Sequence, residues 1–147
     1  MAVATCVTLA ACGGGHTATK QDVIAQGNAI CAGALRDIRA LPAPPTGGAS
    51  TAGLAKYLQQ VVPIIHKEIA DLRALPRPAR DRALLDRYLS AEASNESAYR
   101  ALLAAARSGN SPAVSATLAT LANSPAAVLA DRYGLTQCAS ASGTGVS

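Results

Sequence analysis

The chain of 147 residues contains no Phe or Trp, four Tyr and one Met, and only 15% of its residues are charged. The shortage of aromatic side chains disfavours a β-sandwich or β-barrel, because strands are enriched in them. Leu, Ile and Val number 30 in all, which is near the lower limit for a globular core. The net charge of +4 is too small to keep the chain disordered by self-repulsion. We therefore expect one domain with a thin core, because two domains would each lack large apolar side chains.

The sequence also lacks the motifs that indicate a particular chemistry. It contains no glycine-rich phosphate loop, no GxSxG nucleophile elbow and no HExxH metal motif. Two His and one Met give little support to a copper or zinc site, and few aromatic side chains disfavour nucleic-acid binding. No apolar run is expected to reach the roughly 18–20 residues of a membrane span, which excludes a polytopic membrane protein. These absences predict a protein that is not an enzyme and carries no cofactor.

Ala is the most abundant residue, with 34 copies, and together with Leu and Arg it favours helices. Apolar side chains recur at spacings of three and four residues in segments 19–41, 51–75, 78–107 and 111–133. Proline or glycine follows each segment, and the connections are short. The sequence therefore predicts an all-α, up-and-down bundle of about four helices.

Two prolines interrupt these helical segments. Pro63 removes a backbone donor from the second segment and is expected to kink it. Pro125 follows Asn123-Ser124 and is expected to break the fourth helix, which then restarts. The bundle domain is expected to span residues 20–138, and the small polar residues 139–147 are expected to form a disordered tail.

The N-terminal residues carry a pattern typical of export. Residues 1–12 are uncharged and mostly apolar, and three glycines follow them. The sequence Leu9-Ala10-Ala11-Cys12 resembles the lipobox of bacterial lipoproteins, in which the Cys thiol receives a diacylglycerol and the signal is removed just before it. The resemblance implies a signal segment at 1–11, lipid attachment at Cys12 and a flexible tether at 12–19.

One feature of this N-terminus departs from the lipoprotein pattern. Such signals begin with Lys or Arg, whereas no basic residue precedes Lys20. We therefore expect the basic beginning of the signal to be missing from this sequence. The alternative is an apolar N-terminal strand or helix that is buried in the fold.

The remaining cysteines support export. If Cys6 leaves with the signal and Cys12 carries lipid, then Cys31 and Cys138 remain, and a pair of thiols in an exported chain indicates a disulfide. The alternative is two separate buried thiols, since free Cys packs as a small hydrophobe. A metal site is disfavoured, because no CxxC motif or nearby His pair accompanies them.

Two further motifs extend the resemblance. Asn28-Ala29-Ile30-Cys31 and Tyr133-Gly134-Leu135-x-x-Cys138, combined with the lipobox and the Ala-rich helices, resemble small exported lipoproteins of actinobacteria. The resemblance implies a location on the outer face of the cell membrane and no established activity. We expect a lipid-anchored scaffold or accessory protein with an envelope protein as partner. The alternative is a carrier that holds a small apolar ligand between its helices.

Single polar residues offer few functional candidates. His66 is the only histidine in the expected fold, and the sequence nominates no partner to orient it, so a solvated or half-buried imidazole is expected. Asn95 falls among apolar positions. It either specifies helix register from a buried position or turns to the polar edge with Glu92 and Glu96.

Two larger groups of residues also have alternative interpretations. The tyrosines either fill the core or line a pocket for an apolar ligand; they are Tyr57, Tyr88, Tyr99 and Tyr133. The segment Arg73–Arg87 contains five Arg, with Asp81 and Asp86 among them and Asp71 just before them. It is expected to form a solvated, salt-bridged surface, and the alternative is contact with anionic lipid head groups or wall polymers.

Overall fold

The computed structural model describes residues 18–42 and 50–143. Every regular element in these two ranges is a helix, in the order α1 (Lys20–Arg39), α2 (Thr51–Arg73), α3 (Arg82–Arg107), α4 (Ser111–Ala122), α5 (Ala126–Tyr133) and α6 (Thr136–Gly143). This confirms the predicted all-α class. Cys12, the signal segment 1–11 and most of the tether lie outside the described residues.

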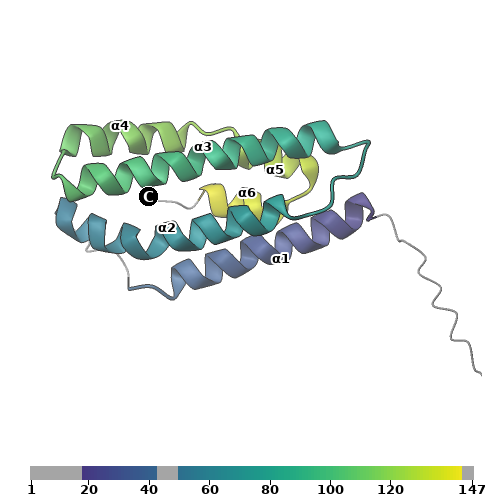
Figure 1. Cartoon of the computed structure of the whole chain (residues 1–147), viewed down its shortest axis with the longest axis horizontal. Coiled ribbons are helices and arrows are strands. Elements are labelled where there is room, and N and C mark those ends of the chain that lie inside the picture. Colours follow the sequence, from purple (N-terminus) through teal and green to yellow (C-terminus); the bar gives the residue numbers. More distant parts are fainter. Residues whose placement is uncertain (1–17, 43–49, 144–147) are drawn as a thin grey trace, which may run out of the picture.

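The first four helices run alternately up and down, as the sequence predicts (Figure 1). The short helices α5 and α6 then turn back at the end of the bundle where α1 begins. There α5 packs against α3, and α6 packs against both α5 and α1. The chain therefore closes on itself, with its last helix against its first.

Side-chain caps fix several helix starts. The Thr19 hydroxyl accepts from the backbone N–H of Asp22, whose carboxylate accepts from the backbone N–H of Thr19, which completes a capping box. Ser50 caps α2 in the same way through the backbone N–H of Gly53, at 3.2 Å. The third helix begins at Arg82 rather than at residue 78, because Pro78 opens a turn that its carbonyl closes with the Asp81 backbone N–H at 3.1 Å.

The two helix-interrupting prolines behave differently. The fourth helical segment is broken as predicted, because α4 ends at Ala122 and α5 begins at Ala126. In contrast, α2 continues as a helix through Pro63, whose side chain is exposed. The kink expected at Pro63 stays a prediction.

The last helix differs from the sequence expectation. Residues 139–147 were expected to form a disordered tail, but α6 extends to Gly143, and residues 144–147 lie outside the described part of the chain. The helix exists for a tertiary reason, because the side-chain carbonyl of Asn28 on α1 accepts from the backbone N–H of Gln137 at 2.9 Å. A contact between residues so far apart in sequence leaves no local signature.

Three clusters of buried apolar residues form the core. The largest joins α1, the end of α2, α3, α5 and α6 and contains Tyr88, Tyr133 and Leu135. A second cluster, of buried residues Ala55, Leu58, Leu102 and Ala106, holds the opposite end. A third, on α2, contains Val61, Ile65 and Ile69. Small residues let the helices approach closely, which compensates for the scarcity of large side chains.

Candidate functional site

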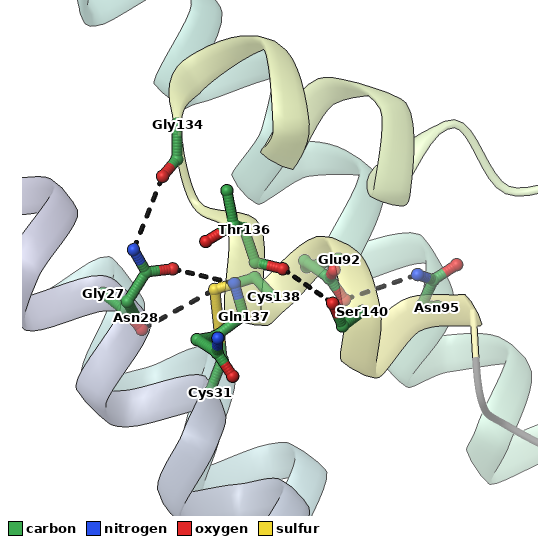
Figure 2. The surroundings of a disulfide bond; sticks show 10 residues. All are labelled: Gly27, Asn28, Cys31, Glu92, Asn95, Gly134, Thr136, Gln137, Cys138 and Ser140. Carbon is green, nitrogen blue, oxygen red and sulfur yellow. Dashed lines mark hydrogen bonds between the residues drawn. A yellow bond between two sulfur atoms is a disulfide. The ribbon is translucent and has the colours of Figure 1, made fainter.

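A disulfide ties the first helix to the last (Figure 2). Cys31 on α1 and Cys138 on α6 are joined at an S–S distance of 2.02 Å across 107 residues of sequence, and both are buried. The predicted bridge between these two cysteines is confirmed.

Residues flanking this bridge fasten the same two helices. The Asn28 side-chain amide donates to the Gly134 carbonyl at 3.4 Å, while its carbonyl caps α6 (Figure 2). Gly134 has a φ of 105°, a left-handed conformation that favours Gly, and it turns the chain between α5 and α6. Leu135 then packs against Gly27, where only a residue without a side chain leaves room for it. The two cysteine-containing motifs therefore act together to hold α1 against α6.

Two carboxyl groups, on α2 and α3, are half-buried. Glu68 extends from α2 and Glu92 from α3, and no cation pairs with Glu68 among the described residues. Burial, and then the negative charge of Glu92, raise the pKa of Glu68 to about 8. Glu68 therefore holds a proton at neutral pH.

Glu92, unlike Glu68, has two hydrogen-bond donors beside its carboxylate. The Tyr88 hydroxyl is hydrogen-bonded to it, and the Asn95 amide donates to it at 3.3 Å. Burial, followed by the neighbouring carboxyl groups, raises the pKa of Tyr88, so the phenol stays a donor. This contact supports the interpretation of Asn95 as a residue of the polar edge.

Sequence reasoning missed the Glu68–Glu92 pair. A signal was present, because Glu68 lies three residues after Ile65 and four before Leu72, both buried, and so borders the apolar stripe of α2. Likewise, Glu92 lies one helical turn after the buried Tyr88. The sequence could not indicate that Glu92 lies close enough for its charge to raise the pKa of Glu68.

His66 has a hydrogen-bond partner, Glu96, which the sequence did not indicate. Its Nδ1 lies 2.7 Å from Glu96 Oε1, and Arg100 donates to the same oxygen at 2.6 Å. Burial opposes ionisation of Glu96, but the hydrogen bonds from His66 and Arg100 outweigh it and lower its pKa. The imidazole is 60% exposed, in line with the expected solvated position, and the three side chains form a surface network.

The arginines of segment 73–87 are exposed and partly paired. Arg77 Nε lies 3.4 Å from Asp86, and Asp81 pairs with Lys20 of α1 at 3.1 Å. The second pair places the turn between α2 and α3 beside the start of α1. This geometry supports the salt-bridged interpretation for Arg77.

The tyrosines divide into two pairs. Tyr88 and Tyr133 are 1% exposed and belong to the largest core cluster. Tyr57 and Tyr99 are half-buried and pack against the third cluster on α2. All four pack in or against the core. None of them lines the groove between α3 and the α4–α5 segment or the smaller cleft between α1 and α2.

The larger cavity is an open groove of about 900 Å³ between α3 and the α4–α5 segment. Its walls combine apolar residues with short polar side chains, among them Ser94, Asn95, Thr120 and Asn123, and the charged Asp86 and Arg87 also line it. The side-chain donors of the four short polar residues are already used within their own helices. The groove therefore offers an incoming ligand mostly apolar contact.

The segment that forms one wall of this groove is unusually apolar. Among the described residues, Ser111–Tyr133 is the one stretch long and apolar enough to cross a membrane by length and composition. The expectation that the sequence contains no apolar run of this length did not account for this segment. Its many Ala residues raise its mean hydropathy although it has few large apolar side chains. The break between α4 and α5 divides the stretch into helices of 12 and 8 residues, both shorter than a span requires.

The described residues thus define an all-α bundle closed by a disulfide, with no group of three or more His, Cys, Asp or Glu side chains that could hold a metal ion. No protein-family model matches the chain, and no curated protein or solved structure matches it either.

Proposed function

We propose that this chain is a lipid-anchored protein on the outer face of the cell membrane that acts without catalysis, as a scaffold or accessory module for an envelope partner. The Cys31–Cys138 disulfide carries the proposal. Disulfides persist in oxidising compartments outside the cytoplasm. The lipobox-like Leu9-Ala10-Ala11-Cys12 then supplies both the route of export and the anchor.

The fold is suited to this arrangement. The tether joins the bundle at Lys20, and the eight residues from Cys12 can span at most about 28 Å. The Lys20–Asp81 pair places the exposed arginines of the α2–α3 turn at this same end. These side chains would then lie nearest to anionic lipid head groups, while the beginning of α4 lies at the opposite end of the bundle (Figure 1).

The anchor is tested by the substitution Cys12→Ser in a chain expressed with a complete export signal. The wild type should sediment with membranes and carry a lipid mass, and Cys12→Ser should be released, because the thioether needs the thiol. Cys6→Ser is the matched control, since the signal would remove it, and it should stay membrane-bound. The proposal fails if Cys12→Ser stays on the membrane and the wild type carries no lipid.

The groove between α3 and the α4–α5 segment supports a second candidate function, that of a carrier for a small apolar ligand. Native mass spectrometry of the protein extracted from its own membrane would detect the bound mass. Ala98→Phe should fill the groove and abolish binding, whereas Ala104→Phe, on the same helix but outside the groove, should not. Equal retention in both variants, or no bound mass in the wild type, would contradict this function.

A further inference from the structure

The acids of the turn between α2 and α3 are already occupied by other cations. Asp81 lies 3.1 Å from Lys20, and Asp86 lies 3.4 Å from Arg77. Both carboxylates are only partly exposed, whereas the arginines around them are exposed. The two acids therefore leave the other arginines of the turn uncompensated.

Three arginines around this turn are exposed and form no ion pair with any described residue. They are Arg73 at the end of α2, Arg80 in the turn and Arg82 at the start of α3. All 9 acidic residues of the sequence lie within the described ranges, so no acidic side chain elsewhere in the chain is left to neutralise them. The turn therefore presents uncompensated positive charge to solvent.

The backbone of the turn is held in place from below. Leu72, Leu75 and Leu85 are buried and belong to the largest core cluster. Pro76 and Pro78 restrict the chain between the two helices, because the proline ring fixes its φ. The arginines thus extend from an ordered backbone, and less entropy is lost when they meet a partner.

We propose that Arg73, Arg80 and Arg82 form a docking surface for the phosphate groups of anionic lipids, which holds this end of the bundle against the membrane. The inference rests on the proposed anchor at Cys12 and adds the lipid chemistry that the bundle itself contacts. Guanidinium groups suit this partner, because they stay charged and donate two parallel hydrogen bonds to phosphate oxygens.

The length of the tether selects this end of the bundle. The Lys20–Asp81 pair fixes the start of α1 beside the start of α3, and the 26 residues of α3 then extend for about 39 Å to the far end (Figure 1). A bundle that stood on its far end would hold Lys20 that far above the membrane, beyond the roughly 28 Å that the residues from Cys12 can span. The far end also carries exposed basic side chains, but on three separate helices: Arg39, Lys56 and Arg107. An anchored bundle that stands on the membrane therefore faces it with the arginine turn.

The contact is electrostatic and does not insert into the bilayer. Apart from the arginines, the exposed residues of the turn are Ala and Pro. Among the described residues, the one large apolar side chain that is exposed is Val128, which lies on α5. Binding should therefore require anionic lipid and should weaken as salt screens the charges.

Cosedimentation with lipid vesicles tests this surface in the full chain carrying Cys12→Ser, which has no lipid of its own. At low salt the chain should bind vesicles of phosphatidylglycerol and phosphatidylcholine about a hundredfold more tightly than vesicles of phosphatidylcholine alone. The variant Arg73→Gln/Arg80→Gln/Arg82→Gln should lose this preference, because each basic side chain near an anionic surface contributes about fivefold. Residues 1–11 are uncharged and common to all variants, so they cannot cause the difference.

The matched control is Arg39→Gln/Lys56→Gln/Arg107→Gln, which removes the same charge from the far end. It should weaken binding by no more than about fivefold, the share of one arginine. Far-ultraviolet circular dichroism should show equal helix content in both variants, since all six side chains are exposed.

Three results would overturn the docking surface. They are equal binding to the two kinds of vesicle, equal weakening in the two triple variants, and binding to soluble polyphosphate at a lower phosphate concentration than to the vesicles. The last result would assign the arginines to a polyanion instead of a membrane. The anchor is judged separately, by the lipid mass on the wild type and by release of Cys12→Ser from cell membranes in a high-salt wash that also removes the arginine contact.

Discussion

Where α1 begins, the core contains both fully buried tyrosines, the disulfide and the contact between Gly27 and Leu135. At the opposite end, where α4 packs on α3, the buried residues are two Ala and two Leu. No residue of α4 itself is buried. A chain with few large side chains has thus gathered most of them, together with its crosslink, at one end.

This difference implies that the two ends open with different free energies. Local opening begins where few apolar side chains are buried and no covalent link holds the elements. The α4 end should therefore exchange its amides first. The crosslinked end should open only when the disulfide is broken or the core contacts around it are weakened.

Removal of the disulfide should have the largest effect and should erase most of the difference between the two ends. The bridge closes a loop of 107 residues, for which the loop-entropy relation gives about 4–5 kcal/mol, and removal of a native disulfide typically costs about 2–5 kcal/mol. The double substitution Cys31→Ala/Cys138→Ala should lower the Tm by about 10–20 °C in a domain of this size. Far-ultraviolet circular dichroism should still report helices below the new midpoint, because apolar stripes specify them. An unchanged Tm would contradict the assigned role of the bridge.

A core deletion at the α4 end should have the next largest effect. Leu102 is 0% exposed and belongs to the small cluster of that end. Leu102→Ala should lower the free energy of unfolding by about 3 kcal/mol, since the cavity it leaves adds to the lost burial. Leu118→Ala, at a half-buried position of α4, is the control and should cost less in the same denaturant titration. Equal losses would mean that α4 is held as firmly as the rest of the bundle.

Two glycines of α1 should respond to substitution with opposite signs. A Cβ at Gly27 would lie 2.5 Å from Leu135 Cδ2, and Leu135 is 0% exposed, so the substitution Gly27→Ala should cost about 1–2 kcal/mol. At Gly33 the nearest atom to a Cβ is a guanidinium nitrogen of Arg36 at 3.8 Å. Gly33→Ala should instead stabilise by up to about 1 kcal/mol through helix propensity. Thermal melts measure both variants. If both substitutions shift the Tm in the same direction, the close approach at Gly27 is unimportant for stability.

The sequence was informative where the signal is local. Apolar stripes, caps and prolines predicted four helical passes and the break before Pro125, because each depends on residues within a few turns. The bridge between Cys31 and Cys138 was predictable only because removal of two other cysteines left one possible pair.

The remaining features depend on contacts between distant parts of the chain. The helix α6 has no apolar stripe of its own and is capped by Asn28, more than a hundred residues earlier. Likewise, Glu68 and Glu96 are both glutamates on helices, but burial raises the pKa of the first and hydrogen bonds lower that of the second. Sequence spacing places a side chain on a helix face, and only the packed fold decides what meets it.

The two buried tyrosines provide the last and smallest test of the crosslinked end. Both are 1% exposed, but the Tyr88 hydroxyl is hydrogen-bonded to Glu92, whereas the Tyr133 hydroxyl is buried without a hydrogen-bond partner among the described residues. A buried hydroxyl that lacks a partner destabilises the fold, while one that satisfies a carboxylate stabilises it. Tyr133→Phe should therefore raise the free energy of unfolding by about 1 kcal/mol, and the ring would still lie beneath Lys20, whose ammonium is 5.0 Å from its centre. Tyr88→Phe should lower the free energy of unfolding by about 1 kcal/mol, because the half-buried carboxylate of Glu92 loses a donor. Equilibrium urea unfolding of both variants measures the two changes, and a stabilising Tyr88→Phe or a destabilising Tyr133→Phe would contradict the hydrogen bonding described for this core.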